Sequence, residues 1–336
     1  MWTPLTSADR VPERRRACSV GVGRAHAKAI LLGEHAVVHG APALALPVPQ
    51  LVVTASIGWS SRPSDGPRGL SCTVTGSPSQ ASVTTSVAGL RRLATEFGAH
   101  IGAADAAHLD VLLDGAIPSA RGLGSSAASA RAVALALADL FGRELPESTT
   151  YDLVQTAENM THGRASGVDA KTVGASRPLL FQEGRTEELR IGCDSLFLIA
   201  DSGVPGSTKD AVELLREGFR GRSGARERFV RRASELAEAG RAALADGRSG
   251  DLGARLTDYH ELLRAAGLST DRTDALVEAA LTAGSSGAKI TGGGLGGCVI
   301  AQTPFGSARQ VIRQLHDAGA VRTWAVPLKG GDGHAR

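Results

Sequence analysis

The hydrophobic and polar positions of the chain follow two different periods in turn, which predicts that strands and helices alternate. Short apolar runs rich in Val, Ile, Leu and Ala are typical of buried or half-buried strands. Such runs occur at residues 19–24, 29–32, 43–57, 109–113, 195–201 and 298–302. Apolar residues at helical spacing predict helices at residues 82–97, 127–140, 148–160, 210–217, 225–245, 252–266, 274–282 and 307–318. Residues 174–190 suggest a hairpin, and residues 60–67 suggest a surface loop.

Breaks in this pattern indicate where elements and domains end. Gly142 and Gly218 stand where two of the helices are expected to stop, since glycine readily adopts the left-handed conformation found there. The chain has 336 residues, and at ~150 residues per domain this length suggests about two domains. Hydrophobic residues make up 42% of the chain, enough for sizeable cores. We place the boundary near residues 185–195, before the strand that starts at Ser195.

Charge and cysteine content exclude several classes of function. The net charge of +3 is modest for this length, and nucleic-acid binding usually needs a concentrated basic face. We interpret Arg14 to Arg16 as part of a solvated leader. Cys18, Cys72, Cys193 and Cys298 are scattered, so they indicate neither a zinc site nor a disulfide framework. Without a signal-peptide-like segment or the ~18 apolar residues of a membrane span, we expect a cytoplasmic protein with no membrane or nucleic-acid partner.

The most informative segment is the loop Pro118–Ser126, which runs directly into an Ala-rich helix. Gly122 and Gly124 lack a Cβ, so they can adopt unusual backbone angles and let a ligand approach. Ser125 or Ser126 is expected to cap the helix. The N-terminus of a helix favours phosphate, but the lysine of a P-loop is missing. Taken alone, the loop fits a phosphate cradle and an ordinary connector equally well.

A second glycine cluster spans Thr291–Cys298. It formally matches the dinucleotide fingerprint from Gly292 to Gly297, and Asp317 lies 20 residues further on. That fingerprint requires a helix directly after the glycines, whereas the residues from Cys298 predict a strand. We therefore disfavour a nicotinamide site. The cluster is either a loop that packs against a ligand or another glycine loop, or a tight turn.

Four further segments bear polar groups near predicted elements. They are Lys28 to His35, Glu158, His162 to Asp169, and Asp201 to Lys209. Each has an ordinary interpretation as a solvated charge, a structural histidine, a turn or a helix cap. A lysine, an acid and a histidine placed around one short apolar run are less easily interpreted in this way.

Together these segments resemble the GHMP kinase superfamily, which includes galactokinases, homoserine kinases and the kinases of mevalonate and phosphomevalonate. The resemblance covers about Cys18 to Leu328 and includes three motifs in family order. The motifs are the Lys28–His35 region, Pro118–Ser126 and Lys289–Gly297. Within the superfamily, the mevalonate kinase branch is the most similar in three segments. These are Gly33 to Gly40, His162 to Asp169 and Gly206 to Lys209.

The resemblance implies an α+β fold of two domains with ATP and substrate in the cleft between them. Residues 18–190 would form an ATP-binding domain like ribosomal protein S5 domain 2. Residues 191–328 would form a ferredoxin-like C-terminal domain, and residues 1–17 and 329–336 would be flexible ends. A homodimer is a further expectation from the family.

The implied reaction transfers the γ-phosphoryl group of ATP to the C5 hydroxyl of (R)-mevalonate, in the route to isoprenoids. Asp169 would accept or orient the hydroxyl proton beside Lys28, and Ser126 and Glu158 would hold Mg²⁺. The expected ATP contacts are Pro118, Arg121, Gly122, Leu123, Gly124, Ser125, Ser126, Gly293 and Gly294. The expected substrate contacts are Lys28, Glu34, His35, Asp169 and Thr208.

Some assignments stay open at this level. Arg121 is either a phosphate contact or a surface charge. Another small-molecule kinase of the superfamily, such as phosphomevalonate kinase, is the nearer alternative function. A non-catalytic relative that acts as a sensor is the more distant one, and it would not need Lys28, Glu158 or Asp169.

Overall fold

A computed structural model describes residues 19–60, 70–76, 80–102, 108–163 and 165–330. The expected leader at residues 1–17, all of the expected tail at residues 329–336 except Lys329 and Gly330, and, except for Ser60, the loop at residues 60–67 lie outside the described part. No helix of the described part is long and apolar enough to cross a membrane.

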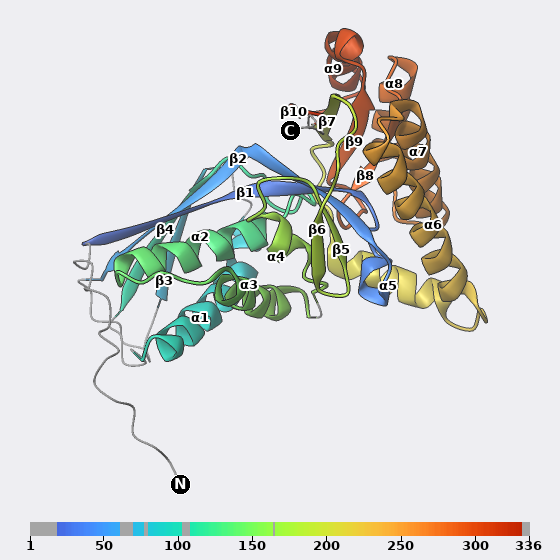
Figure 1. Cartoon of the computed structure of the whole chain (residues 1–336). Coiled ribbons are helices and arrows are strands. Elements are labelled where there is room, and N and C mark those ends of the chain that lie inside the picture. Colours follow the sequence, from blue (N-terminus) through green and yellow to red (C-terminus); the bar gives the residue numbers. More distant parts are fainter. Residues whose placement is uncertain (1–18, 61–69, 77–79, 103–107, 164, 331–336) are drawn as a thin grey trace, which may run out of the picture.

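The N-terminal half of the chain forms a six-stranded mixed sheet (Figure 1). Its strands are β1 (Val20–Leu32), β2 (Ala43–Trp59), β3 (Leu70–Gly76), β4 (Leu109–Gly115), β5 (Leu179–Gln182) and β6 (Arg185–Glu188). The order is β3-β4-β2-β5-β6, with β1 also paired to β2. Only β3 and β4 run parallel; the other pairs are antiparallel.

Helices cover one face of this sheet (Figure 1). They are α1 (Gln80–His100), α2 (Ser125–Leu140), α3 (Glu147–His162) and the short α4 (Val168–Thr172). Helix α2 lies directly on β1, where a Cβ on Gly21 would be 2.2 Å from the carbonyl oxygen of Ala136 and one on Gly23 would be 2.1 Å from that of Ala132. Because both strand residues lack side chains, the helix can approach this closely, and its N-terminus is fixed beside the strand.

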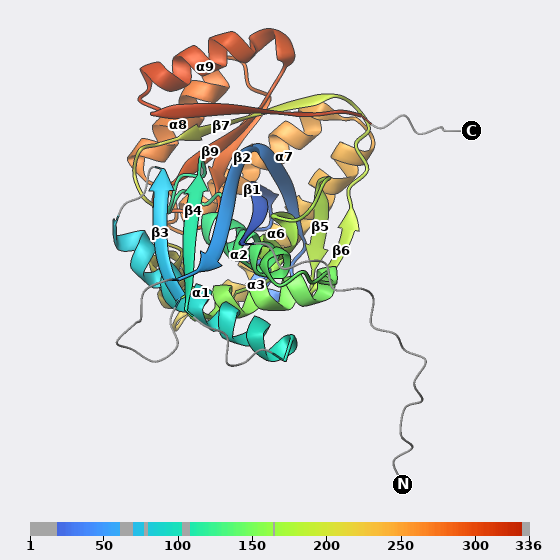
Figure 2. The same cartoon turned by 90° about the vertical axis from the view of Figure 1, so that its left-hand side faces the viewer.

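The C-terminal half forms a second, four-stranded antiparallel sheet (Figure 2). Its strands are β7 (Ser195–Asp201), β8 (Gly287–Thr291), β9 (Cys298–Thr303) and β10 (Arg322–Leu328), in the order β10-β7-β9-β8. The helices are α5 (Thr208–Phe219), α6 (Ala225–Ala245), α7 (Ser249–Ala265), α8 (Asp271–Thr282) and α9 (Ala308–Asp317). Single 3₁₀ turns occupy Val37–His39 and Phe305–Ser307.

The two halves pack tightly where β1 and β2 meet α6. A Cβ on Gly240 would be 2.3 Å from Leu32 Cδ1 and 3.7 Å from Leu44 Cδ1. The buried core is correspondingly continuous from the first sheet to the second. The expected two-domain α+β fold is confirmed.

Most predicted elements are present, and the differences have local causes. The strands expected at 19–24 and 29–32 are one strand, β1, whose burial alternates at first and is complete from Ala27 onward. Helix α5 continues through Gly218 to Phe219, so the expected stop at that glycine was wrong. The sequence pattern missed β3, β8 and β10, which are edge strands of their sheets, where polar residues and proline are tolerated.

Candidate active site

A cavity of about 700 Å³ opens where the two domains meet. Most of the expected site residues line it: Lys28, Glu34, His35, Arg121, Gly122, Gly124, Ser125, Ser126, Glu158, Asp169, Thr208 and Gly293. Pro118, Leu123 and Gly294 do not line the cavity. Leu123 is buried in the core, and Gly294 packs against Leu268, whose carbonyl oxygen would be 2.5 Å from an added Cβ.

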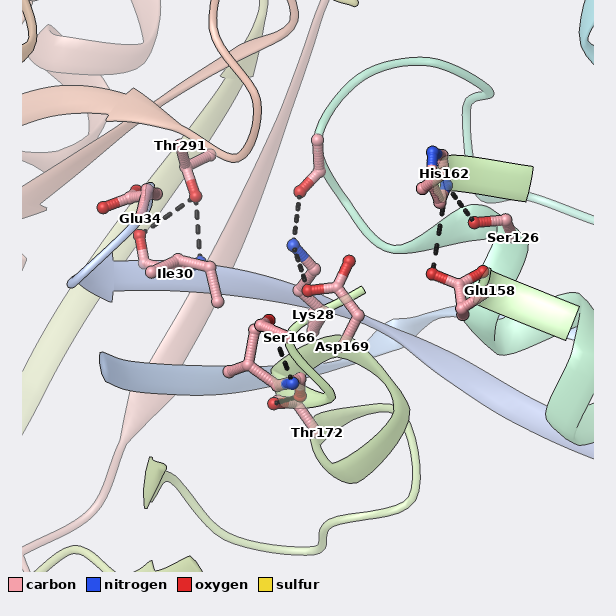
Figure 3. Close-up of polar contacts among 12 residues, drawn as sticks. Lys28, Ile30, Glu34, Ser126, Glu158, His162, Ser166, Asp169, Thr172 and Thr291 are labelled. Atoms are coloured by element: carbon pink, nitrogen blue, oxygen red, sulfur yellow. Dashed lines mark hydrogen bonds and ion pairs between the residues drawn. The ribbon is translucent and has the colours of Figure 1, made fainter. Parts of the chain in front are cut away.

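An ion pair between Lys28 and Asp169 lies at the wall of the cavity (Figure 3). The Lys28 Nζ is 3.0 Å from Asp169 Oδ1 and donates a hydrogen bond of 3.0 Å to the carbonyl oxygen of Gly122. Lys28 is 3% exposed, whereas the Asp169 side chain is 33% exposed. The ammonium is thus held inside the protein, while the carboxylate remains accessible from the cavity.

The glycine loop closes over the stem of Lys28. The Lys28 amide donates to the carbonyl oxygen of Leu123 at 3.0 Å. Gly124 has a φ of 69°, and a Cβ there would lie 2.8 Å from Lys28 Cγ. Since a side chain at this position would displace the lysine, Gly124 is required both for its backbone angle and for the space.

Helix α2 begins at this loop without a side-chain cap. Its N-cap residue is Gly124, and neither Ser125 nor Ser126 caps the helix, so that expectation was wrong. The first amides of a helix have no partner within the helix. Because no hydroxyl occupies them here, they are available to an anion, which the positive end of the helix dipole also favours.

Oxygen donors lie together on α2 and α3 at the cavity wall. The Ser126 hydroxyl lies 3.3 Å from His162 Nε2, which is 3.9 Å from Glu158 Oε2 (Figure 3). Burial, and secondly the negative charge of Asp169, raise the pKa of Glu158 to about 7. Burial lowers the pKa of His162. A carboxylate that is costly to ionise here would be stabilised by a nearby cation.

Beyond Lys28, the end of β1 carries a second, deeply buried ion pair. Lys289 on β8 contacts Glu34 Oε1, and the two side chains are 0% and 3% exposed. Lys289 also donates to the carbonyl oxygen of Ile30 at 3.3 Å. Burial shifts both groups toward neutrality, raising the pKa of Glu34 and lowering that of Lys289. The Tyr259 hydroxyl on α7 donates to the Glu34 carbonyl oxygen at 2.8 Å and so also fixes the main chain of Glu34.

The polar atoms next to this pair are not all satisfied. Glu34 Oε2 and His35 Nε2 are buried and have no hydrogen-bond partner among the described residues. His35 has a φ of 61°, in the left-handed region. Burial lowers its pKa to about 4, while a hydrogen bond to the backbone of Gly293 acts in the opposite direction. Buried polar atoms without partners at a cavity wall are candidates for contacts with a polar ligand.

The depressed pKa of His35 predicts a loss of stability in mild acid. The unfolded chain binds a proton below about pH 6.5 and the folded protein only near pH 4, so stability is present above pH 6.5 and is lost as the pH falls toward 4. At about pH 5 the free energy of unfolding lost in this way is up to about 2 kcal/mol. We expect wild type to lose more free energy of unfolding than His35→Asn between about pH 7.5 and about pH 5. Parallel denaturation profiles would contradict this; asparagine tolerates the positive φ.

The C-terminal domain adds Thr208 to the cavity wall and supplies the partner of Arg121. Thr208 opens α5 directly after Ser207, whose hydroxyl caps the helix by accepting from Asp210. A Cβ on Gly293 would be 2.5 Å from Thr208 Oγ1, so a larger residue at position 293 would displace the threonine side chain. The Arg121 guanidinium is bonded to Asp201 at 2.7 Å rather than extended into solvent.

Sequence reasoning missed two contributors to this geometry. The role of Lys289 has a signal in the sequence, because a lysine between Ala288 and Ile290 in an apolar strand requires a buried partner. The contact of Tyr259 with the Glu34 carbonyl has no signal in the sequence, since a tyrosine on an amphipathic helix usually serves as a core residue.

Comparisons with known proteins agree with this architecture. Residues 85–174 match the GHMP kinase N-terminal domain model, and residues 236–321 match the GHMP kinase C-terminal model. A mevalonate kinase from Pyrococcus horikoshii is 32% identical over 218 residues, which is 63% of this chain and 64%, just under two thirds, of that relative. A mevalonate kinase from Thermococcus sibiricus is 31% identical over 294 residues, covering 83% of this chain and 88% of the relative.

A solved structure gives the same result for the fold. The crystal structure of L. major mevalonate kinase in complex with R-mevalonate is 20% identical, with a TM-score of 0.79 and coverage of 95% of this chain and 99% of that one. At this identity the likeness concerns the fold alone. Because both domain models match in order and a relative above 30% identity aligns over most of its length, the chain belongs to the GHMP kinase family.

Proposed function

We propose that the protein is a mevalonate kinase, which transfers the γ-phosphoryl group of ATP to the C5 hydroxyl of (R)-mevalonate. The observation that carries the proposal is the Lys28–Asp169 pair, 3.0 Å apart, beside a glycine loop that opens a helix. Phosphoryl transfer depends on positioning and charge neutralisation, and this arrangement supplies both. The choice of mevalonate rests on the names of the relatives.

The chain's own residues account for the main steps. The amides at the start of α2 would bind the phosphate oxygens, and Lys28 would neutralise charge on the γ-phosphoryl group. The C5 oxygen would form a bond to the γ-phosphorus as the bond to the β,γ-bridging oxygen breaks. The proton of the C5 hydroxyl would pass to Asp169, leaving a phosphomonoester and ADP. Because the transition state is loose, little deprotonation is needed before the phosphorus–oxygen bond is broken.

Ser126 and Glu158 fit a magnesium site. Both are oxygen donors, which a hard divalent cation prefers, and the raised pKa of Glu158 marks a buried carboxyl without a cation close enough to offset its burial. When bound there, Mg²⁺ would neutralise charge on the ATP phosphates.

On the substrate side, the groups near the β1 end must recognise a carboxylate and a tertiary hydroxyl. His35 Nε2 and Glu34 Oε2 lack partners within the described chain, so a ligand can supply them. Thr208 lines the same cavity. Glu34 Oε1 already contacts Lys289, so this carboxylate would serve both the fold and the substrate. A homodimer and a cytoplasmic location are further parts of the proposal.

The proposal is tested by an ADP-release assay with four acceptors under identical conditions: mevalonate, phosphomevalonate, galactose and homoserine. Of the four acceptors, we expect only mevalonate to be turned over. Preferred turnover of phosphomevalonate would favour the nearer alternative. ATP binding without turnover on any acceptor would favour a non-catalytic relative.

Gly124→Ala should reduce turnover because the new Cβ collides with Lys28. Gly102→Ala is the matched control: its φ is also 69°, but no atom of the described residues lies within 4 Å of an added Cβ. Both substitutions introduce the same left-handed strain, on the order of 1–2 kcal/mol. We expect kcat to fall by roughly tenfold to a hundredfold only for Gly124→Ala, since a misplaced catalytic group has effects of this size. Equal kcat values in the two variants would contradict the described loop–lysine contact.

Glu158→Gln should raise the Mg²⁺ concentration needed for half-maximal activity. The amide keeps the shape of the side chain and one oxygen donor but removes the charge that attracts the cation. The measurement is a Mg²⁺ titration of the initial rate at saturating ATP, with Glu147→Gln as control. Glu147 pairs with Arg131 and its side chain is 60% exposed. If the two variants titrate alike, Glu158 has no part in metal binding.

A further inference from the structure

One side chain of the phosphate loop (Pro118–Ser126) reaches across the domain junction. Arg121 Nε lies 2.7 Å from Asp201 Oδ1, and its Nη2 donates to the carbonyl oxygen of Gly203 at 3.0 Å. Asp201 is the last residue of β7, in the C-terminal domain, and its side chain is only 5% exposed. The Gly203 amide donates to the same carboxylate oxygen at 2.8 Å. The pair is therefore a closed network of charge-assisted hydrogen bonds.

Main-chain contacts join the same two segments. The Gly206 amide donates to the carbonyl oxygen of Ala120 at 2.8 Å. A Cβ on Gly297 would lie 3.0 Å from the Arg121 carbonyl oxygen, and one on Gly122 would lie 2.4 Å from that of Thr291. The phosphate loop is thus in direct contact with two glycine-containing loops of the C-terminal domain, the one with Gly206 and the one at Gly292–Gly297.

The phosphate loop contains a strained backbone conformation at Ala120. Ala120 has a φ of 55°, in the left-handed region that a residue with a Cβ adopts at a cost of about 1–2 kcal/mol. Such a conformation persists only where the surroundings impose it. Its neighbour Arg121 is anchored through the side chain and Ala120 itself through its carbonyl oxygen. These are the contacts that impose it.

We propose that Arg121 is a positioning residue, whose ion pair with Asp201 fixes the phosphate loop against the C-terminal domain. The next residue, Gly122, carries the carbonyl oxygen that accepts a hydrogen bond from Lys28 Nζ. By fixing this carbonyl, the Arg121–Asp201 pair also helps to position Lys28. Turning Arg121 toward the phosphates would leave Asp201 buried without its cation, which is unfavourable. The inference rests on the proposed function only in that the loop binds ATP.

The test measures binding of the ATP analogue AMPPNP with Mg²⁺ by calorimetry for Arg121→Ala, Asp201→Asn and the double variant. We expect each single variant to weaken binding by roughly tenfold and to lower kcat, because misplacement of binding and catalytic groups has effects of at least this order. The double variant should be no weaker than the worse single one, since both remove one interaction. Arg131→Ala is the control. It breaks another ion pair of a largely buried arginine, 11% exposed against 17% for Arg121, and should leave the affinity within about twofold.

Three results would overturn the inference. If Arg121→Ala weakens binding while Asp201→Asn leaves it unchanged or tightens it, Arg121 contacts the phosphates itself. If neither variant differs from Arg131→Ala in affinity, the pair only supports the fold. Should Arg121→Ala not fold, Arg121→Lys keeps the charge but not the two-pronged contact, and unchanged affinity in that variant would likewise overturn the inference. AMPPNP binding needs no acceptor, so a negative mevalonate assay leaves this test valid.

Discussion

Asp169→Asn is expected to reduce kcat by about 10³-fold while ATP and mevalonate still bind, because the loss of a positioned proton acceptor has effects of this order. Asparagine keeps the size of the side chain and can still accept a hydrogen bond from Lys28, which is 3.0 Å away in the ion pair. The geometry of the site should therefore persist. The measurement is a comparison of kcat with the dissociation constants of both ligands.

The control for this variant is Asp152→Asn on α3. It removes a carboxylate from the same domain without touching Lys28, and it should leave kcat unchanged. Near-normal kcat in Asp169→Asn would remove Asp169 from proton transfer. A parallel loss of ligand binding would show instead that the residue mainly holds the substrate or Lys28.

Lys289→Met is expected to lower the free energy of unfolding by about 3–5 kcal/mol, since it leaves the carboxylate of Glu34 buried without its partner. Both side chains are almost completely buried at the domain junction. Equilibrium denaturation of the variant and wild type measures the difference. The double variant with Glu34→Gln should be more stable than Lys289→Met alone, because no uncompensated charge remains.

Lys329→Met provides the control for the buried pair. Lys329 pairs with Asp194 at 2.8 Å, but the two side chains are 78% and 49% exposed. Solvent screens such a pair, so its loss should hardly change stability. If Lys289→Met were as mild as Lys329→Met, the buried pair would not hold the domains together.

The sequence was sufficient for the chemical groups of the site but not for all their contacts. Gly122 and Gly124 could be recognised because glycines directly before an Ala-rich helix indicate a loop that a ligand can approach, and Lys28 and Asp169 because they stand in family motifs. Their mutual distance could not be predicted, since β1 and α4 are brought together only by the packing of the sheet and its helices.

The contacts between domains were the least predictable. Arg121 had two open interpretations, and its partner Asp201 is 80 residues away in the sequence. Lys289 and Glu34 are separated by 255 residues. No periodicity links residues that far apart, and the pairing of side chains across a junction follows only from the tertiary structure. The expected helix cap at Ser125 or Ser126 was wrong for a local reason. Gly124 takes the cap position of α2, so no side chain caps the first amides of the helix.

The proposed reaction geometry can be checked in a structure of the protein with mevalonate and AMPPNP. We expect the C5 hydroxyl of mevalonate to lie within hydrogen-bond reach of Asp169, about 2.6–3.2 Å, with the triphosphate on the amides at the start of α2 and Lys28 next to the γ-phosphate. A mevalonate molecule whose C5 hydroxyl points away from Asp169, or a triphosphate bound outside the Pro118–Ser126 loop, would contradict the proposed reaction.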